Sequence, residues 1–344
     1  MTTHLEFAPL ERGMSRTTNR VLLVIGAVGV VAILYRFLFG LGAATNLSNQ
    51  YPWGVWKAIS VAAAVALATG GFTMAALVHV FHRRAYEPLA RLALLIGVLG
   101  YTFGAASLAV DIGRYYNIWH PAWPTMWQGN SVLFEVAMCI MSYLMILYVE
   151  FTPVICERYA GRVALPGGLA RWNGAVEALL RAAERLTGRV LSVLLLVGIV
   201  LSCMHHSSLG ALMLVAPHKM HPFWYTPVLP LLFLLSVLAA GFAVVILVSI
   251  LTARGAGRRP DLPALSSLSL YVLVFLAVYL VARISDLLIR EVHLHLTAGG
   301  VEPLWLLIEL LPGGLLPLLL LVRRGYATRR RSWDGHAGWW GSGC

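Results

Sequence analysis

Several residues that can carry protons lie inside long apolar stretches of this sequence. Glu135 and Glu309 supply carboxyl groups, and His205 and His206 form an adjacent pair of imidazoles. An ionisable side chain at membrane depth is costly, so its presence there indicates a function. An imidazole can donate a hydrogen bond to a carbonyl oxygen, and a carboxylic acid can deliver a proton to it. These groups suit a ligand that is mostly apolar but has protonatable ends, which is the chemistry of a quinone.

The depth of each group follows from the rise of an α-helix. At ~1.5 Å per residue, Glu135 lies ~6 Å, Glu309 ~8 Å and Arg283 ~10 Å inside the outer ends of their apolar runs. Asp286 lies one turn further out than Arg283. The histidine pair lies ~14 Å down, near mid-depth. We therefore expect most of the buried ionisable groups in the outer half of the membrane.

Each of these groups also has a structural alternative. Arg283 and Asp286, spaced i,i+3, can form an ion pair that steadies helix packing. Asp111 and Arg114 repeat this spacing at the outer boundary, where they can form an interfacial pair. A histidine can be hydrogen-bonded across helices without acting on a ligand. Because adjacent helical residues point about 100° apart, at most one of the two imidazoles is expected to face a shared cavity.

Two further groups lie near the opposite, inner ends of their runs. His79 and Glu150 could admit protons from the inner side. The alternative is that both side chains reach to the inner interface, where they remain solvated. We keep both as candidates for proton transfer, together with Arg283, Asp286 and Glu309.

Long apolar runs must position these groups. Charged residues make up 12% of the 344 residues, against ~25% in soluble domains, while hydrophobic residues reach 59% and the mean hydropathy is +0.77. These values exclude an ordinary soluble protein, and runs of about 20 apolar residues can cross the hydrocarbon core. The sequence predicts an all-α polytopic membrane protein with eight transmembrane helices, at residues 21–41, 55–81, 89–113, 131–151, 190–215, 228–252, 264–290 and 304–322.

Charged and aromatic residues predict the orientation of these helices. Most of the 26 Lys and Arg residues lie before the first run, after each even-numbered run and at the end of the chain. The positive-inside rule then places both termini in the cytoplasm. Aromatic residues such as Trp119, Trp123 and Trp127 lie at the opposite ends, where an interfacial belt is expected. We therefore expect a multi-pass membrane protein whose aromatic ends lie on the non-cytoplasmic side.

The longest inner connection, residues 152–189, divides the chain. We expect a cytoplasmic segment over residues 1–20, four-helix bundles over 21–151 and 190–322, and a basic cytoplasmic tail over 323–344. Within the connection, Trp172, Val176, Leu179 and Ala183 recur at helical spacing opposite a set of arginines. This pattern predicts an amphipathic helix that lies on the inner membrane surface.

Several cofactors and partners are disfavoured. The four cysteines lie far apart without a C-x-x-C pair, so no iron–sulfur cluster is expected in this chain. A haem inside the bilayer commonly takes histidines from two facing helices, whereas one run alone carries histidine near mid-depth, so no haem is expected unless methionine is a ligand. No metal tetrad is evident. Arginines that flank apolar runs indicate contact with the lipid membrane rather than with nucleic acid.

Five blocks of sequence carry a resemblance to one family of membrane subunits. The blocks are Tyr51-Pro-Trp-Gly-Val-Trp56, Asp111-Ile-Gly-Arg-Tyr115, Asn130-Ser-Val-Leu-Phe-Glu135, Met204-His-His-Ser-Ser-Leu-Gly210 and His221-Pro-Phe-Trp224. In order and spacing they resemble the NrfD/polysulfide-reductase family, most closely its hydrogenase-2 (HybB-type) branch. The likeness extends from about residue 34 to residue 322, so it is far more specific than hydropathy alone.

The resemblance implies partners and a site. It implies two four-helix bundles without haem, docked on the periplasmic face to a ferredoxin-like iron–sulfur subunit. In the hydrogenase branch the large and small subunits of a [NiFe] hydrogenase would join them, and in other branches a molybdenum enzyme. Glu135 and His205 would belong to the quinone and proton site, with Asp111 and Arg114 beside them.

We therefore expect a quinone-reactive membrane anchor that passes electrons from a partner cluster to menaquinone or ubiquinone. The chain is expected to be inactive without its partners. Whether electron transfer is coupled to proton transfer stays open. One alternative is a proton-coupled secondary transporter, for which Gly70-Gly71 supplies a helix break although the matching helix of the second half has only Gly241. The other alternative is a haem-binding cytochrome b-type anchor, which an absorption spectrum would reveal.

Overall fold

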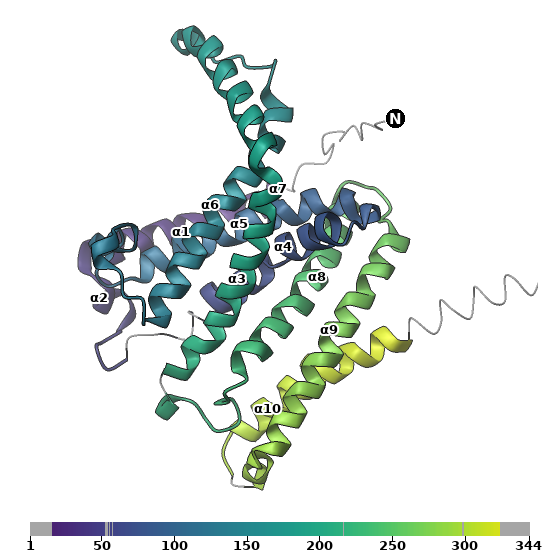
Figure 1. Cartoon of the computed structure of the whole chain (residues 1–344). Helices are drawn as coiled ribbons and strands as arrows, with labels where there is room; N and C mark the ends of the chain where they lie inside the picture. The colour runs from purple at the N-terminus through teal and green to yellow at the C-terminus, as the bar shows by residue number, and fades with distance from the viewer. Residues whose placement is uncertain are drawn as a thin grey trace, which may run out of the picture.

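The computed structural model describes residues 16–51, 54, 56, 58–215, 217–297 and 299–323. Every regular element in these ranges is a helix, and they contain no strand (Figure 1). Eight helical stretches are long and apolar enough to cross a membrane: Arg16–Phe39, Ile59–Val80, Arg84–Asp111, Val132–Tyr159, Gly167–Val215, Leu229–Gly255, Leu262–Ile289 and Glu302–Arg323. The predicted all-α fold with eight membrane-spanning helices is confirmed.

Some predictions fall outside the described residues. These are the segment 1–15, the tail from residue 324 onward, and Pro52, Trp53 and Val55 of the first sequence block. The division into two bundles and the placement of the termini in the cytoplasm remain predictions.

Most of the long helices are regular. The long α-helices are α1 (Arg16–Phe39), α5 (Glu87–Asp111), α6 (Val132–Tyr159), α7 (Asn173–Leu212), α8 (Leu229–Gly255) and α9 (Leu262–Ile289). The short helix α2 (Leu41–Thr45) follows α1, and α10 (Glu302–Leu310) continues through a π-helical stretch (Leu311–Leu315). Ser131 and Asp261 cap the starts of α6 and α9 by accepting hydrogen bonds from the backbone N–H of Phe134 and Ala264. Prolines in the first turn suit α5, α8, α9 and α10, because their fixed φ matches that position.

Short 3₁₀ turns form much of the connections. They span Arg84–Tyr86, Tyr115–Asn117, His120–Ala122, Pro124–Met126, Gly167–Trp172, Met213–Val215, Pro217–Lys219 and Val292–Thr297. Three of them lie in the aromatic connection between α5 and α6, which is therefore compact.

The second span is irregular. A π-helical stretch (Ala58–Ala63) leads into α3 (Ala64–Ala68), and after Thr69 α4 (Gly70–Ala75) leads into another π-helical stretch (Ala76–Val80). Such departures from α-helical geometry are frequent at functional sites. The break at Thr69 lies beside the candidate site described below.

Gly70 and Gly241 allow α4 and α8 to cross at short distance. A Cβ atom added at Gly70 would lie 2.7 Å from Cγ2 of Val245 and 3.1 Å from the carbonyl oxygen of Gly241. A Cβ atom added at Gly241 would lie 3.0 Å from the backbone nitrogen of Gly70. These glycines therefore permit a close helix crossing of the kind small residues provide in membranes.

Two apolar clusters flank the second span. One joins Val65 to Tyr101 and Leu147, and the other joins Met74 to Phe242. All five side chains are buried. The second span thereby connects helices from both halves of the chain, and it holds the helices that carry the candidate site.

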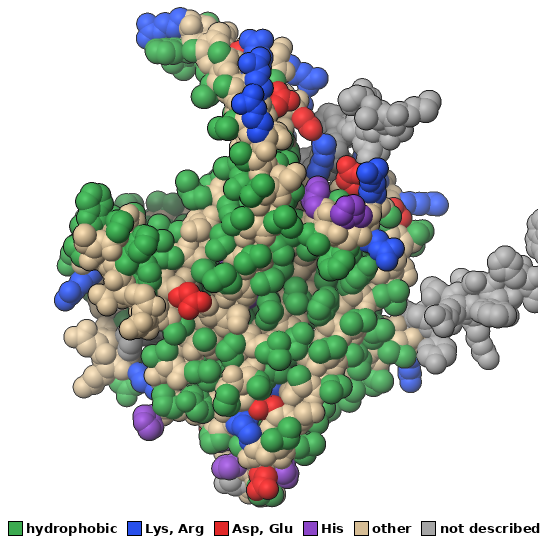
Figure 2. Space-filling view, viewed as in Figure 1, with side chains coloured by type: hydrophobic (Ala, Val, Ile, Leu, Met, Phe, Trp, Pro, Cys, Tyr) green, Lys and Arg blue, Asp and Glu red, His purple; other side chains and the backbone are tan. Residues whose placement is uncertain are grey.

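The helix α7 is longer than a membrane requires. Its 40 residues span about 60 Å, whereas the hydrocarbon core is about 30 Å thick. Its first part rises out of the helix bundle at the top of Figure 1, and Figure 2 shows Lys and Arg side chains along that extension, above a body covered by hydrophobic side chains. The amphipathic segment expected to lie on the membrane surface is instead the first part of α7, because the helix continues without a break into the span and packs against the end of α6.

The helix α1 is attached mainly through one side chain. Arg36 is its single buried residue, at 4% exposure. The guanidinium donates hydrogen bonds to the carbonyl oxygens of Val110 and Ile112 at the end of α5, and it lies over the rings of Phe37 and Tyr115. A charged group thus satisfies the terminal carbonyls of a neighbouring helix.

Candidate functional site

The adjacent histidines of α7 form the centre of the candidate site. His205 and His206 are both fully buried, and their ring centroids lie 4.2 Å apart. Nδ1 of His205 lies 2.9 Å from the carbonyl oxygen of Leu201, and Nδ1 of His206 lies 2.6 Å from that of Ser202. A carbonyl oxygen can only accept, so each Nδ1 carries the hydrogen and each Nε2 is an acceptor.

Two hydroxyl groups from other helices bind the two Nε2 atoms. The hydroxyl of Tyr101 on α5 lies 2.6 Å from Nε2 of His205, and that of Thr69 lies 2.9 Å from Nε2 of His206. Tyr101 and Thr69 are fully buried, as are the histidines. Both imidazoles therefore face the protein interior, because two different helices approach adjacent residues of α7. The expectation that at most one of them faces a shared cavity stays a prediction.

Tyr143 of α6 completes the packing around His205. Its ring lies 5.6 Å from that of His205 and 4.8 Å from that of Tyr101, measured between centroids. Tyr143 is 1% exposed. Neither tyrosine nor Thr69 was among the residues predicted from the sequence, although a hydroxyl group within an apolar run is a signal that could have identified them.

Glu135 lies in the first turn of α6, one helical turn away from this centre. The hydroxyl of Ser208 donates a hydrogen bond of 2.5 Å to Oε1 of Glu135. Ser208 follows His205 by three residues and therefore lies on the same side of α7. Ser208 is buried, whereas the Glu135 side chain is exposed at the apolar surface. The structure thus brings Glu135 and His205 to the same contact between α6 and α7.

Glu150 lies toward the opposite end of the contact between α6 and α7 from Glu135. Its side chain is 9% exposed, and a Cβ atom added at Gly198 of α7 would lie 3.2 Å from its Oε1. Among the described residues, no hydrogen bond or ion pair to Glu150 is found. His79, the other inner candidate, is exposed in the second π-helical stretch and does not join it.

Asp111 and Arg114 lie at the end of α5 and just beyond it. Asp111 is the last residue of that helix, and Arg114 is exposed in the connection that follows. The arginine that enters the protein here is Arg36, which binds the backbone on either side of Asp111.

Arg283, Asp286 and Glu309 belong to a separate ionic cluster. Arg283, at 2% exposure, binds Glu309 through Nε at 2.9 Å and through a terminal nitrogen at 3.2 Å. The same carboxylate accepts hydrogen bonds from Tyr279 and Trp224, at 2.6 and 2.7 Å. Arg283 also donates to the carbonyl oxygen of Phe223. The carboxylate of Glu309 is thus fully hydrogen-bonded, as a charge held at this depth must be.

Asp286 forms a closer ion pair with Arg290 than with Arg283. It lies 2.6 Å from Arg290, and it also accepts a hydrogen bond of 2.6 Å from Thr226. The expected i,i+3 pair with Arg283 is a longer contact of 3.9 Å. Arg290 further donates to the carbonyl oxygens of Pro222 and Tyr225. Arg283 of α9 and Arg290, which directly follows that helix, therefore hold the connection before α8 in place. This favours the structural alternative for this cluster.

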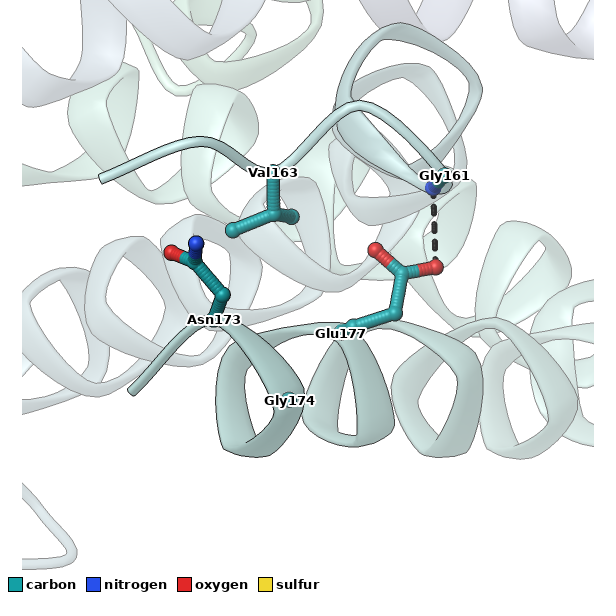
Figure 3. Close-up of a pocket in the computed structure, with 5 residues that line it drawn as sticks. All are labelled: Gly161, Val163, Asn173, Gly174 and Glu177. Atoms are coloured by element: carbon teal, nitrogen blue, oxygen red, sulfur yellow. Dashed lines mark hydrogen bonds between the residues drawn. The ribbon is translucent and has the colours of Figure 1, made fainter. Parts of the chain in front are cut away.

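A separate hollow lies far from the histidines. It has a volume of about 330 Å³ and is lined by Gly161, Val163, Asn173, Gly174 and Glu177, at the tip of the connection between α6 and α7 (Figure 3). Glu177 points to the backbone N–H of Gly161 and accepts a 2.8 Å hydrogen bond from it. The carboxylate is thus used within the chain, and Glu177 is the single ionisable group among these lining residues.

The buried histidines as placed do not fit haem iron. An axial ligand must offer an imidazole nitrogen, and both nitrogens of His205 and His206 are within hydrogen-bond distance of groups of this chain. Within the described ranges, no group of three or more His, Cys, Asp or Glu is arranged to hold a metal ion.

Eight apolar helices around a buried, hydrogen-bonded group of histidines and tyrosines define a polytopic membrane protein with proton-carrying groups inside it. The chain belongs to the NrfD family, because residues 43–328 match the family described as "Polysulphide reductase, NrfD". The family predicted from the five sequence blocks is therefore confirmed.

Curated relatives lie in several oxidoreductase systems. The chain is 34% identical to the "Probable Ni/Fe-hydrogenase 2 b-type cytochrome subunit" of Escherichia coli, over 88% of this chain and 74% of that protein. It is 28% identical to the "Menaquinone reductase, integral membrane subunit" of Nitratidesulfovibrio vulgaris, over 84% of this chain and 69% of that protein. It is 23% identical to a selenate reductase subunit of Mesobacillus selenatarsenatis, over 78% of this chain and 64% of that protein.

Proposed function

We propose that this chain is the quinone-reactive membrane subunit of a respiratory oxidoreductase complex. It would pass electrons between a partner iron–sulfur subunit and menaquinone or ubiquinone in the membrane. The observation that carries this proposal is the placement of Glu135, bound to Ser208, one turn away from the buried pair of Tyr101 and His205. The names of the hydrogenase and menaquinone reductase relatives support it.

The exposure of Glu135 favours it as the residue that meets the quinone headgroup. Its carboxyl group lies at the apolar surface of α6, where a lipid-borne molecule can reach it, whereas His205 is fully buried. Reduction of a quinone to a quinol takes two electrons and two protons. In this proposal the electrons come from the partner cluster, and the carboxyl group of Glu135 donates a proton to a quinone oxygen. His205 and Tyr101 act behind it, as the groups that return a proton to Glu135.

The contact between α6 and α7 offers a route for those protons. Glu150 and Tyr143 lie two turns apart on one face of α6, and both approach Gly198 of α7. Tyr143 in turn packs against His205. The gaps between these groups exceed one hydrogen bond, so we propose that water bridges complete the route. Proton uptake would then enter at Glu150, on the side that the arginines predict to be cytoplasmic.

The remaining expectations are part of the same proposal. A ferredoxin-like subunit, with a [NiFe] hydrogenase pair or a molybdenum enzyme behind it, would dock at the aromatic, periplasmic ends of the helices in a bacterial inner membrane. The chain itself would hold no iron–sulfur cluster and no haem, and the hydrogen-bonded histidine nitrogens support the absence of haem. Asp111, Arg114, His79 and the cluster around Arg283 have weaker support as site residues, because no described contact joins them to Glu135 or His205.

The geometry gives less support to a transporter. A transporter of this size is expected to bind its solute at broken helices in corresponding places of both halves. The break at Thr69 is filled by its hydrogen bond to His206, and Gly70 and Gly241 are in mutual contact.

A substitution at Glu135 tests the proposal in the assembled complex. We expect Glu135→Gln to lower quinone-linked turnover by about 100-fold or more, the scale of a lost acid–base group, while activity with an artificial acceptor stays unchanged. Glu87→Gln, an exposed carboxylate in the first turn of α5, is the matched control and should leave both activities unchanged. Full quinone turnover in Glu135→Gln would reject the proposal.

A further inference from the structure

One hydrogen bond holds the carboxyl group of Glu135 against α7. The Ser208 hydroxyl donates it to Oε1 over 2.5 Å, and among the described residues Ser208 is the single hydrogen-bond partner of the Glu135 side chain. The two residues are 73 positions apart in the chain, so the bond joins the first turn of α6 to α7. Ser208 is 6% exposed, whereas the Glu135 side chain is exposed. A buried hydroxyl therefore restrains a carboxyl group that faces outward.

The Ser208 hydroxyl differs from four other serines of this protein in the group to which it donates. Ser236 and Ser249 of α8, and Ser267 and Ser269 of α9, donate to backbone carbonyl oxygens three or four residues earlier in their own helix. That local bond is a common choice for a serine within a helix. Ser208 has the same choice but donates to a side chain of another helix. Its bond therefore serves the contact between α6 and α7 and is not needed to satisfy the serine.

Packing keeps Ser208 in place on α7. Two residues further along, a Cβ atom added at Gly210 would lie 2.7 Å from Cα of Pro230, so α7 packs directly against the start of α8. One turn before Ser208, the imidazole of His205 is hydrogen-bonded to α5. A group on a rigid element can hold a longer, more flexible side chain in one orientation. Without this bond, Glu135, in the first turn of α6, could turn its carboxyl group toward the nearby membrane surface.

The bond bears on one step of the proposed reaction, the donation of a proton by Glu135 to a quinone oxygen. A carboxylic acid has one hydrogen, and Oε1 already accepts from Ser208, so the acidic hydrogen belongs on Oε2. Once that proton has left, the carboxylate is a charge at an apolar surface, which is costly. A hydroxyl binds a carboxylate more strongly than a neutral acid. The Ser208 bond therefore strengthens as the proton leaves, and an interaction that is stronger in the transition state speeds the step.

We infer, on the basis of the function proposed above, that Ser208 is a positioning residue that orients the carboxyl group of Glu135 and supports the negative charge formed on it. Ser208 does not touch the quinone and acts only through Glu135. A residue of this kind has no further effect on the reaction once the carboxyl group is gone. A residue that only supports the fold would keep its effect.

Steady-state kinetics of the assembled complex test this role with a double-mutant cycle of Ser208→Ala and Glu135→Gln. We expect Ser208→Ala to lower kcat with quinone at least about 10-fold, the scale of one lost charge-assisted hydrogen bond, while KM for the quinone stays within about twofold. In the Glu135→Gln background, Ser208→Ala should lower the residual kcat no further. Ser207→Ala is the matched control, because it removes a hydroxyl from the preceding residue of α7, whose side chain has no described hydrogen bond, and it should leave kcat unchanged.

Activity with an artificial acceptor should stay unchanged in every variant, which verifies that the complex is assembled. Full kcat in Ser208→Ala beside an impaired Glu135→Gln would overturn the role of Ser208 and leave the proposed function standing. Full quinone turnover in Glu135→Gln would overturn both. An equal loss from Ser208→Ala in the two backgrounds, or a rise in KM at unchanged kcat, would also overturn the positioning role.

Discussion

The hydroxyl group of Tyr101 lies 2.6 Å from Nε2 of His205, and both side chains are completely buried. Because Nδ1 of His205 donates to a backbone carbonyl, Nε2 accepts the tyrosine hydrogen. This bond orients the imidazole of His205 inside the helix bundle. It also joins α5 to α7 at the depth where Ser208 reaches Glu135, so the pair links helix packing to the proposed proton chemistry.

Removal of the Tyr101 hydroxyl tests this link. We expect Tyr101→Phe to leave the fold intact, at a cost of about 1 kcal/mol for one lost hydrogen bond, and to lower quinone-linked turnover in the assembled complex. Tyr148→Phe is the matched control, because the Tyr148 hydroxyl lies 2.9 Å from that of Thr102 but the side chain is 42% exposed. Equal turnover in the two variants would show that the Tyr101 hydroxyl has no part in the reaction.

The two histidines should differ in their effect on turnover. His205→Ala removes the imidazole nearest to Glu135, so we expect a loss of quinone-linked turnover of about 100-fold or more. His206→Ala removes one of the two partners of the Thr69 hydroxyl, which keeps the carbonyl oxygen of Val65 as an acceptor, so we expect chiefly a loss of stability of about 0.5–1.5 kcal/mol from one lost hydrogen bond. Steady-state kinetics and thermal unfolding of both variants separate these effects. The reverse order of turnover would place the reactive face of α7 at His206.

The ionic cluster around Arg283 should behave as a stabilising unit. Glu309→Leu leaves the guanidinium of Arg283 buried without its carboxylate, at an expected cost of about 3–5 kcal/mol. The double variant Arg283→Met, Glu309→Leu should be less destabilised than the single variant, because it leaves no uncompensated charge. Thermal unfolding in nanodiscs measures both. A double variant that unfolds at a lower temperature than the single one would contradict this account.

The close crossing of α4 and α8 should tolerate no added volume. We expect Gly241→Ala to destabilise the protein by about 1–3 kcal/mol, because the new methyl group would press on the backbone of Gly70. Gly255→Ala, at the end of the same helix, is the matched control, since a Cβ atom there meets nothing within 4 Å. If both variants unfold at the same temperature, the two helices have room to separate at Gly241.

The absorption spectrum of the purified chain tests the expected absence of haem. With both nitrogens of each buried histidine hydrogen-bonded, we expect no α-band of a b-type haem in a reduced-minus-oxidised spectrum. The E. coli relative is named a b-type cytochrome subunit, so the measurement is needed for this chain. An α-band in stoichiometric amount would show that the histidines rearrange to bind iron.

The sequence alone predicted the parts of this protein that depend on local patterns. The eight spans follow from apolar length, and Glu135 and His205 stood out because charge is costly in lipid. Contacts between residues distant in the chain could not be predicted in this way. Glu309 lies 26 residues from Arg283, and Tyr101 lies 104 residues from His205, so only packing reveals these pairs. The sequence also did not predict that α7 is a single helix of 40 residues. Its amphipathic first part has the pattern of a helix on the membrane surface, and only the structure shows that this part packs against the end of α6.

The attachment of α1 through Arg36 has one consequence for a protein that handles protons. An arginine keeps its charge throughout the physiological range, and a backbone carbonyl has no proton to gain or lose. The bond between α1 and the end of α5 is therefore indifferent to acidity, unlike any contact that relies on a carboxylate. Acidification of the compartment that bathes this end of the helices would leave these two hydrogen bonds of Arg36 unchanged.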